Sequence, residues 1–364
     1  MKFSPHTTLV VVAVLGILLL NGNGSSVSES EGQLAATGKT TTKGYECATK
    51  ARPREFAHEP YYSGPLADSH LHLPVSSTIV STVGERLGFK GMPAFGGKLT
   101  RDYLACLLKS EGITKVFAFA MTTRYSLSAE LQSVAYFAKA HSGLIAPFYM
   151  PGPYESLRIE PSKAARGIDK TKGLFKGIGE LKSFEKTEID NPHTGALLKI
   201  AEERAFLTMM HPLPHELESA NRLVKQFPKV KFLVHGGKDN NEVLAELMRR
   251  YPNVSRSLDA DLTALYGNDR RHQNENLTKD EWLAYMRNNF DKLLESAVGD
   301  WKEKIEREPS RFLWGTDRWY DWHFDEEVGA LITEWSRAFI GRLSPEVREQ
   351  FAYKNALILL GDGK

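Results

Sequence analysis

The chain has 364 residues, of which 41% are hydrophobic and 25% are charged, as is typical of a globular protein with a sizeable core. Its formal net charge is only +2, so the composition gives no electrostatic sign of a nucleic-acid-binding protein. With only two cysteines, the fold cannot depend on a disulfide framework.

The first residues have the pattern of an export signal. Lys2 supplies a positive charge, and the apolar run Leu9–Leu20 is short for a membrane span. Gly22 and Gly24 place small residues at the positions that a signal peptidase requires. We therefore expect a signal peptide over residues 1–24 and a secreted or otherwise extracytoplasmic protein. An uncleaved N-terminal membrane anchor is the alternative.

Residues 25–62 follow as an expected flexible linker and lead-in, since the first half of this stretch is rich in Ser, Gly and Thr. An oxidising compartment would allow Cys47 to pair with Cys106, and two unpaired thiols are the alternative. Asn253 and Asn276 match the glycosylation acceptor pattern, which matters only in a host that has this machinery.

From about residue 63 to residue 364, short apolar runs alternate with amphipathic helical patterns. The expected strands are 66–71, 114–121, 144–150, 174–181, 206–210, 231–234, 254–258 and 312–316. The expected helices between the first seven strands are 100–110, 128–141, 162–170, 194–204, 215–227 and 241–251. Several runs are almost continuously hydrophobic, as strands buried on both faces require. Eight such units predict one α/β domain, a (β/α)8 TIM barrel, over residues 63–364.

The unit between the seventh and eighth strands is enlarged. Residues 266–276 are polar and suggest a lid over the barrel mouth, and 278–308 predict one or two charged helices. Large apolar side chains recur there at helical spacing, which favours burial over a binding stripe (Trp282, Phe290, Leu293 and Trp301). Residues 325–342 and 345–360 predict extra C-terminal helices that close the barrel wall.

His70 and His72 stand two residues apart at the end of the first expected strand. Side chains at i and i+2 of a strand point the same way, so the two imidazoles can chelate one metal ion. Alone, this pair is a weak signal, because His-x-His also occurs without a metal.

Further potential ligands follow four other expected strands. They are Glu180, His211, His235 and Asp317. Parallel strands of a barrel bring their C-terminal ends to one mouth, and imidazole with carboxylate suits zinc and similar divalent metals. Each residue alone could be structural, since an Asp after Gly-Thr can cap a helix. Five strand ends that carry only His, Glu and Asp favour a metal site.

These residues, in this order, resemble the amidohydrolase superfamily, specifically its amidohydrolase-related branch. The resemblance implies that His70 and His72 bind one divalent metal with Asp317. It also implies that His211 and His235 serve a second ion and that Glu180 bridges the two. Lys182 shares a strand face with Glu180, so either side chain could face the metal. Members of this branch often use one ion and some use none, and in a one-metal site His235 would more readily contact substrate than metal.

The resemblance implies an enzyme that uses a divalent metal, with zinc expected, on a small-molecule substrate. The first interpretation is hydrolysis of an amide, lactone or ester-like bond, with Asp317 as the proton shuttle. The alternatives are a metal-dependent non-oxidative decarboxylase and a non-catalytic small-molecule binding barrel. Arg318, Lys182 and Arg256 lie at or near strand ends and would suit a substrate carboxylate or phosphate, although ion pairs explain such residues equally well.

Overall fold

The eight strands of the computed structural model follow the eight predicted apolar runs. The structure describes residues 50–76, 81–82, 92–152, 158–183, 187–259 and 278–362. The strands are β1 Leu66–His72, β2 Ile113–Thr122, β3 Ile145–Pro151, β4 Gly177–Lys182, β5 Leu207–His211, β6 Lys231–Val234, β7 Val254–Leu258 and β8 Phe312–Trp314. Their sequence order is also their order in the sheet, and neighbours pair in parallel.

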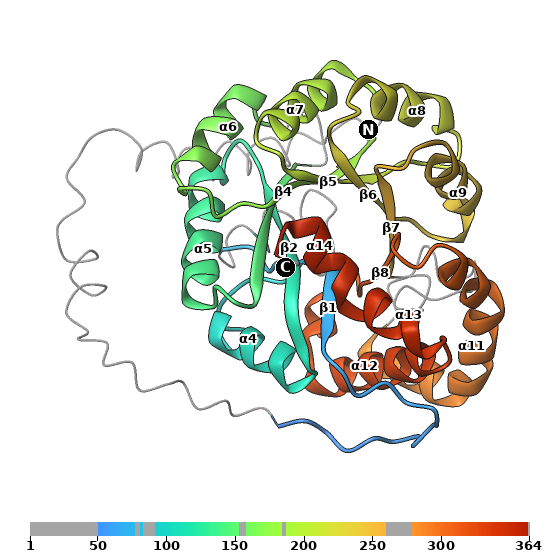
Figure 1. The fold of residues 1–364 in the computed structure, drawn as a ribbon. Helices are drawn as coiled ribbons and strands as arrows, with labels where there is room; N and C mark the ends of the chain where they lie inside the picture. The colour runs from blue at the N-terminus through green and yellow to red at the C-terminus, as the bar shows by residue number, and fades with distance from the viewer. Residues whose placement is uncertain are drawn as a thin grey trace, which may run out of the picture. The chain divides into compact units, whose positions relative to one another are not determined.

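The sheet curves round until its first and last strands meet (Figure 1). Leu71 of β1 forms an isolated parallel bridge to Arg318, just beyond β8. The His72 N–H donates to the Arg318 carbonyl at 3.0 Å, and the Asp317 N–H donates to the His70 carbonyl at 2.7 Å. The predicted (β/α)8 barrel is therefore confirmed.

Helices surround the barrel, most of them between successive strands and the C-terminal ones after β8 (Figure 1). Their bounds are α4 Arg101–Ser110, α5 Leu127–Ala140, α6 Pro161–Asp169, α7 Pro192–Glu203, α8 Leu217–Gln226, α9 Asn241–Arg250, α11 Lys279–Arg307, α12 Glu326–Gly341, α13 Pro345–Glu349 and α14 Asn355–Leu360. Three short turns are also helical, η2 Lys238–Asn240, η3 Asp321–Phe324 and the π-helical η4 Gln350–Lys354. Helix α11 begins at a capping box, in which Thr278 and Glu281 satisfy each other's backbone N–H groups.

The protein has two apolar cores, one inside the barrel and one between the barrel and the helices. The inner core is built from side chains such as Phe117, Phe148 and Met209. Leu71 packs in the outer core, so β1 points its two histidines the other way, as predicted. The aromatics of α11 are buried in the outer core, which confirms the prediction that they are not a binding stripe (Trp282, Phe290 and Trp301).

Residues 50–62 lie against the outside of the barrel wall. The N–H groups of Glu55 and Phe56 donate to the carboxylate of Glu334 on α12 at 2.7 and 2.8 Å. The Phe56 ring stacks on Phe290 of α11 with centroids 4.0 Å apart. This part of the expected lead-in is therefore ordered by packing.

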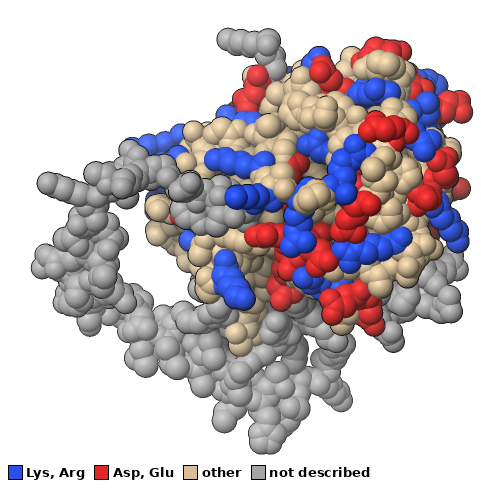
Figure 2. All heavy atoms as spheres, turned by 90° about the horizontal axis from the view of Figure 1, so that it is seen from below, with Lys and Arg blue, Asp and Glu red and all other residues tan. Residues whose placement is uncertain are grey.

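Several expectations lie outside the described residues. They are the export signal and linker up to residue 49, with Cys47 and hence its pairing, and the polar segment 266–276 with Asn276. Cys106 is buried on α4, and the Asn253 side-chain amide donates to the Val230 carbonyl at 2.8 Å. Among the helices that the structure describes, none has the length and apolar character needed to cross a membrane. Figure 2 shows Lys and Arg interspersed with Asp and Glu over one face.

Candidate metal centre

Six side chains meet at the mouth of the barrel, because the strands that carry them end there. Strand β1 supplies His70 and His72, and strands β4 and β5 supply Glu180 and His211. His235 follows β6, and Asp317 follows β8. All the residues expected to bind metal thus lie in one cluster, as the barrel topology requires.

The first part of the cluster surrounds the two histidines of β1. Their ring centroids lie 4.7 Å apart. The Oδ1 atom of Asp317 lies 3.4 Å from His70 Nε2 and 3.1 Å from His72 Nε2. These three side chains therefore present ring nitrogens and a carboxylate oxygen to a common point.

Glu180 joins this first part of the cluster to a second. Its Oε1 atom lies 2.5 Å from His211 Nδ1 and 2.9 Å from His235 Nε2, whereas its Oε2 atom lies 3.7 Å from His72 Nε2. Gly179 makes this placement possible, because its φ is +141° and a Cβ there would lie 2.6 Å from the Met209 carbonyl. Glu180, and not Lys182, is thus the β4 residue that lies among the imidazoles.

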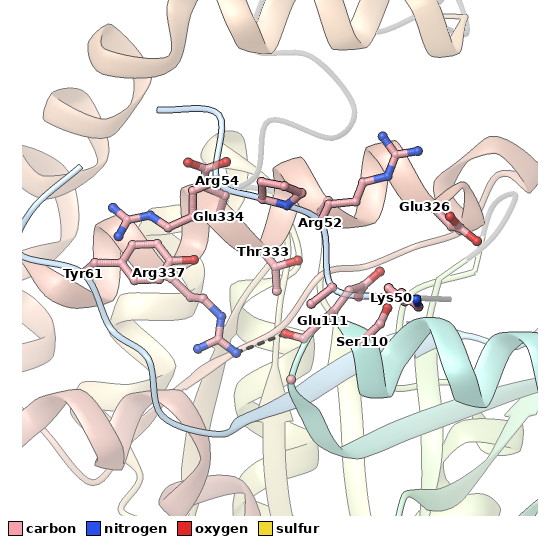
Figure 3. Close-up of a pocket in the computed structure, with 14 residues that line it drawn as sticks. Lys50, Arg52, Arg54, Tyr61, Ser110, Glu111, Glu326, Thr333, Glu334 and Arg337 are labelled. Atoms are coloured by element: carbon pink, nitrogen blue, oxygen red, sulfur yellow. Dashed lines mark hydrogen bonds between the residues drawn. The ribbon is translucent and has the colours of Figure 1, made fainter. Parts of the chain in front are cut away.

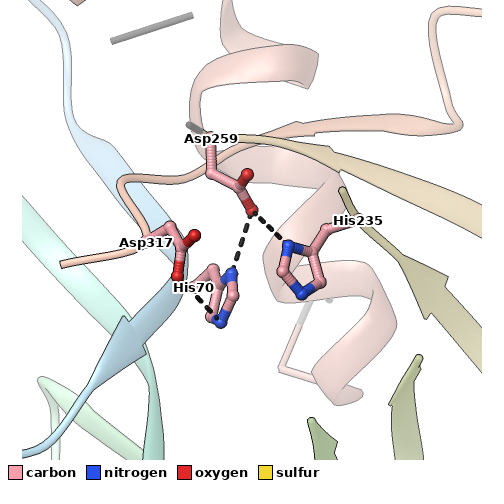
Figure 4. Close-up of side chains that lie close together, drawn as sticks. All are labelled: His70, His235, Asp259 and Asp317. Atoms are coloured by element: carbon pink, nitrogen blue, oxygen red, sulfur yellow. Dashed lines mark hydrogen bonds and ion pairs between the residues drawn. The ribbon is translucent and has the colours of Figure 1, made fainter. Parts of the chain in front are cut away.

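Asp259, which the sequence analysis did not single out, belongs to the same cluster (Figure 4). It follows β7 directly and is only 1% exposed. Its Oδ2 atom lies 3.0 Å from His70 Nδ1 and 3.6 Å from His235 Nδ1. A strand-end position was the available signal, but no motif surrounds this residue.

A second buried carboxylate, Asp68, fixes the backbone beneath the cluster. It accepts hydrogen bonds from the His70 N–H at 3.0 Å, the Thr316 N–H at 2.9 Å and the Thr316 hydroxyl at 2.6 Å. Asp68 therefore ties β1 to the turn that carries Asp317.

The imidazoles of the cluster differ in pKa, because burial lowers it for some and neighbouring carboxylates raise it for another. Burial lowers the pKa of His72 to about 4 and that of His211 to about 3, which favours their neutral, metal-ligating form. Burial also opposes charge on His235, but the carboxylates of Glu180 and Asp259 outweigh it and raise that pKa to about 10. Burial raises the pKa of Asp317 to about 7.

The residues fit a divalent metal ion. His70 Nε2, which faces Asp317, is buried and has no hydrogen-bond partner among the described residues. Three overlapping groups of His, Asp and Glu have ligand atoms within 4.8 Å of one another. Nitrogen and oxygen ligands of this kind suit zinc and its first-row neighbours.

The three cations expected to contact substrate lie in different places. Arg318 is fully buried and points to Glu111, with Nη2 and Oε2 2.7 Å apart. Arg256 is 2% exposed, hydrogen-bonds Asn241 and lies over the Trp301 ring at 4.5 Å, away from the mouth. Arg256 points away from the mouth because of strand alternation, and Arg318 is held in an ion pair. Neither arginine is therefore placed to contact substrate. Lys182 remains, with its Nζ atom 3.7 Å from Glu180 Oε1.

The cavity of about 210 Å³ shown in Figure 3 lies elsewhere, between residues 50–54, the end of α4 and α12. Two of its central charged groups, Arg337 and Glu334, are engaged in the fold. Arg337 donates to the carbonyls of Gly64 and Glu111 at 2.7 and 3.0 Å, and Glu334 accepts from the lead-in. We therefore place the functional site at the cluster and not in this cavity.

Solved structures with a similar fold cover most of the chain. A protein described as a 2-pyrone-4,6-dicarboxylic acid hydrolase from Pseudomonas putida is 15% identical, with a TM-score of 0.52, and the match covers 82% of this chain and 98% of that one. An amidohydrolase from Burkholderia multivorans with bound zinc is 14% identical, with a TM-score of 0.51 and coverage of 82% and 99%. The 5-carboxyvanillate decarboxylase of Sphingomonas paucimobilis is 14% identical, with a TM-score of 0.49 and coverage of 82% and 99%.

A comparison with curated proteins found no match. The family model described as amidohydrolase, in contrast, matches residues 67–361, which include all of the barrel strands except Leu66 at the start of β1, and the whole histidine–carboxylate cluster. The chain therefore belongs to the amidohydrolase family.

Proposed function

We propose that the chain is a metal-dependent hydrolase that acts on an amide, lactone or ester-like bond of a small molecule. The observation that carries this proposal is the position of Glu180. One of its carboxylate oxygens lies near His211 and His235, and the other faces His72. A carboxylate so placed suits two ions that share a hydrolytic water.

In this proposal, His70, His72 and Asp317 would hold one divalent ion, zinc by the chemistry of the donor set. His211 and His235 would hold a second, and Glu180 would be available to both. When bound, such an ion lowers the pKa of a water molecule to about 7 and polarises the bond to be cleaved.

Asp317 is the proposed proton shuttle. Its side chain is 13% exposed at the mouth, where the substrate must arrive. General acid–base help of this kind contributes roughly 10²–10⁴-fold to rate.

Lys182 is the proposed substrate contact. Its side chain is 30% exposed, and it lines a small cavity beside Glu180 together with Arg158 and His193. The cavity holds about 10 Å³, which is room for one water-sized group. Two cations there suit a carboxylate or phosphate oxygen of the substrate.

A non-oxidative decarboxylase is the second candidate, and the charge on His235 favours it. This side chain is 2% exposed, and its neighbouring carboxylates raise its pKa to about 10. A protonated imidazole near the substrate could supply the proton that replaces CO₂ on carbon.

Metal analysis tests the shared premise of both candidates. Purified protein should carry one or two zinc ions per chain, and the His70→Ala/His72→Ala variant should lose metal. The exposed His215 provides the control, since His215→Ala should keep the wild-type content. Equal metal in the wild type and the double variant would remove the metal site. Glu180→Gln should lower a content of two ions to one.

Isotope labelling separates the two reactions. A screen of lactones, amides and carboxylic acids on zinc-loaded protein identifies a substrate, which is then turned over in ¹⁸O-labelled water. Label in the acyl product, abolished by Asp317→Asn, supports hydrolysis. Release of CO₂ with solvent deuterium on the product carbon would replace hydrolysis by decarboxylation.

We also propose that the protein is exported and cleaved after Gly24. The apolar run and the small residues that follow it support this location. N-terminal sequencing of the mature protein should begin at Ser25. An intact Met1 on membrane-associated protein would favour the anchor instead.

A further inference from the structure

Asp259, which follows β7, is placed between two imidazoles that come from β1 and from the end of β6 (Figure 4). Its Oδ2 atom lies 3.0 Å from the Nδ1 atom of His70 and 3.6 Å from the Nδ1 atom of His235. Figure 4 shows both rings turning the same kind of nitrogen toward this carboxylate. One oxygen atom thus faces the Nδ1 positions of both rings.

The opposite nitrogens of the two rings face the rest of the cluster. His70 Nε2 lies 3.4 Å from Asp317 Oδ1, and His235 Nε2 lies 2.9 Å from Glu180 Oε1. An ionised carboxylate only accepts hydrogen bonds, so His70 Nδ1, which lies within hydrogen-bond distance of Asp259, carries the hydrogen. In neutral His70, the lone pair then lies on Nε2, the nitrogen that faces the metal position. His235 differs, because carboxylates face both of its ring nitrogens.

We propose that Asp259 is a positioning residue, which fixes His70 in the Nδ1–H form and directs its Nε2 atom into the metal centre. This inference rests on the proposed metal-dependent function. Carboxylate groups that hold the second nitrogen of a ligating histidine are a general way to set its orientation and basicity.

A purely structural role explains this placement less well. Asp259 is 1% exposed, and a carboxylate in such surroundings is costly to desolvate. Its carboxylate faces ring nitrogens of His70 and His235, whereas the equally buried Asp68 accepts from backbone N–H groups and a hydroxyl. The carboxylate of Asp259 therefore contacts the imidazoles of the site, whereas that of Asp68 holds the backbone beneath it.

Ring ¹⁵N chemical shifts of the chelator-treated wild-type protein test the proposal directly. Long-range ¹H–¹⁵N correlation spectra should show hydrogen on Nδ1 of His70. In Asp259→Asn, whose amide can donate as well as accept, the Nδ1–H signature of His70 should weaken. A wild-type His70 with hydrogen on Nε2 alone would overturn the proposal, whether or not the variant folds.

Zinc affinity, measured by competition with a chromophoric chelator, is the second readout. Asp259→Asn should bind zinc 10–100-fold more weakly than the wild type. The matched control is Glu130→Gln, because Glu130 is a buried carboxylate that accepts from the Ser76 N–H and hydroxyl at 2.9 and 2.6 Å and not from an imidazole. Wild-type affinity in Asp259→Asn would overturn the proposal. A wild type that binds no zinc would instead overturn the proposed function, and the ring spectra alone would then decide the role of Asp259.

Discussion

The buried ion pair between Arg318 and Glu111 predicts a large loss of stability when one partner is changed. The guanidinium donates to the two carboxylate oxygens at 3.1 and 2.7 Å, and the two side chains are 0% and 3% exposed. Glu111 ends α4, so the pair anchors the chain just beyond Asp317. Glu111→Gln leaves a buried guanidinium without its carboxylate, which should cost roughly 3–5 kcal/mol of unfolding free energy, on the order of 10 °C in Tm.

Denaturant unfolding of the zinc-loaded protein measures this loss. The Glu111→Gln/Arg318→Met double variant should recover part of it, because the unpaired charge is gone. Glu349→Gln, which breaks the exposed pair with Lys354, should have little effect and serves as the control. A Glu111→Gln protein as stable as the wild type would refute the reasoning. A stable Arg318→Met protein with a raised KM would return Arg318 to the substrate site.

Three further predictions concern the metal, pH and the backbone. Chelation should lower the Tm of the wild type but not that of His70→Ala/His72→Ala, and equal shifts would contradict specific binding. Burial lowers the pKa of His323 well below its usual 6.5, so the unfolded state takes up the proton and stability falls as the pH drops below 6.5. His323→Gln should reduce the slope of unfolding free energy against pH by up to about 1.4 kcal/mol per pH unit. Equal slopes for the wild type and the variant would show that His323 is not the group responsible. Gly236 has a φ of +153°, and a Cβ there would lie 2.4 Å from Asn240 Nδ2. Gly236→Ala should therefore lower the free energy of unfolding by roughly 1–3 kcal/mol, as measured in urea. Gly143→Ala is the control, because a Cβ at that position has no atom within 4 Å.

The fold could be predicted because its signals are local. Strands β6 and β7 have the bounds that their apolar runs predict, since the inner and outer cores bury both faces of a barrel strand. Strand β8 is shorter than its run, because residues 315–317 leave the strand to form the turn that carries Asp317. Capping residues also mark α4 and α11 at the predicted starts.

The site could be predicted only in part, because side-chain partners are not local. Every expected metal residue lies in the cluster, since a strand-end position is enough to bring it there. Arg318 illustrates the failure, as its neighbour Asp317 faces the mouth while its own side chain meets Glu111, which is 207 residues away along the chain. Asp259 was not predicted, because its contacts are with rings from β1 and the end of β6, and no sequence pattern around it indicates them.

The cluster can be complete only after β8 docks beside β1, because its residues come from both the first and the last strand of the barrel. During synthesis His72 emerges 245 residues before Asp317, so a growing chain holds a pair of histidines long before it holds the full ligand set. Contacts of such separation form late in folding, because the entropy of closing the loop must first be overcome. Tight metal capture should therefore coincide with docking of β8. A chain that ends before this strand keeps His70 and His72 but lacks Asp317. If the proposed metal site is correct, stable metal retention would therefore report that synthesis and folding have both been completed.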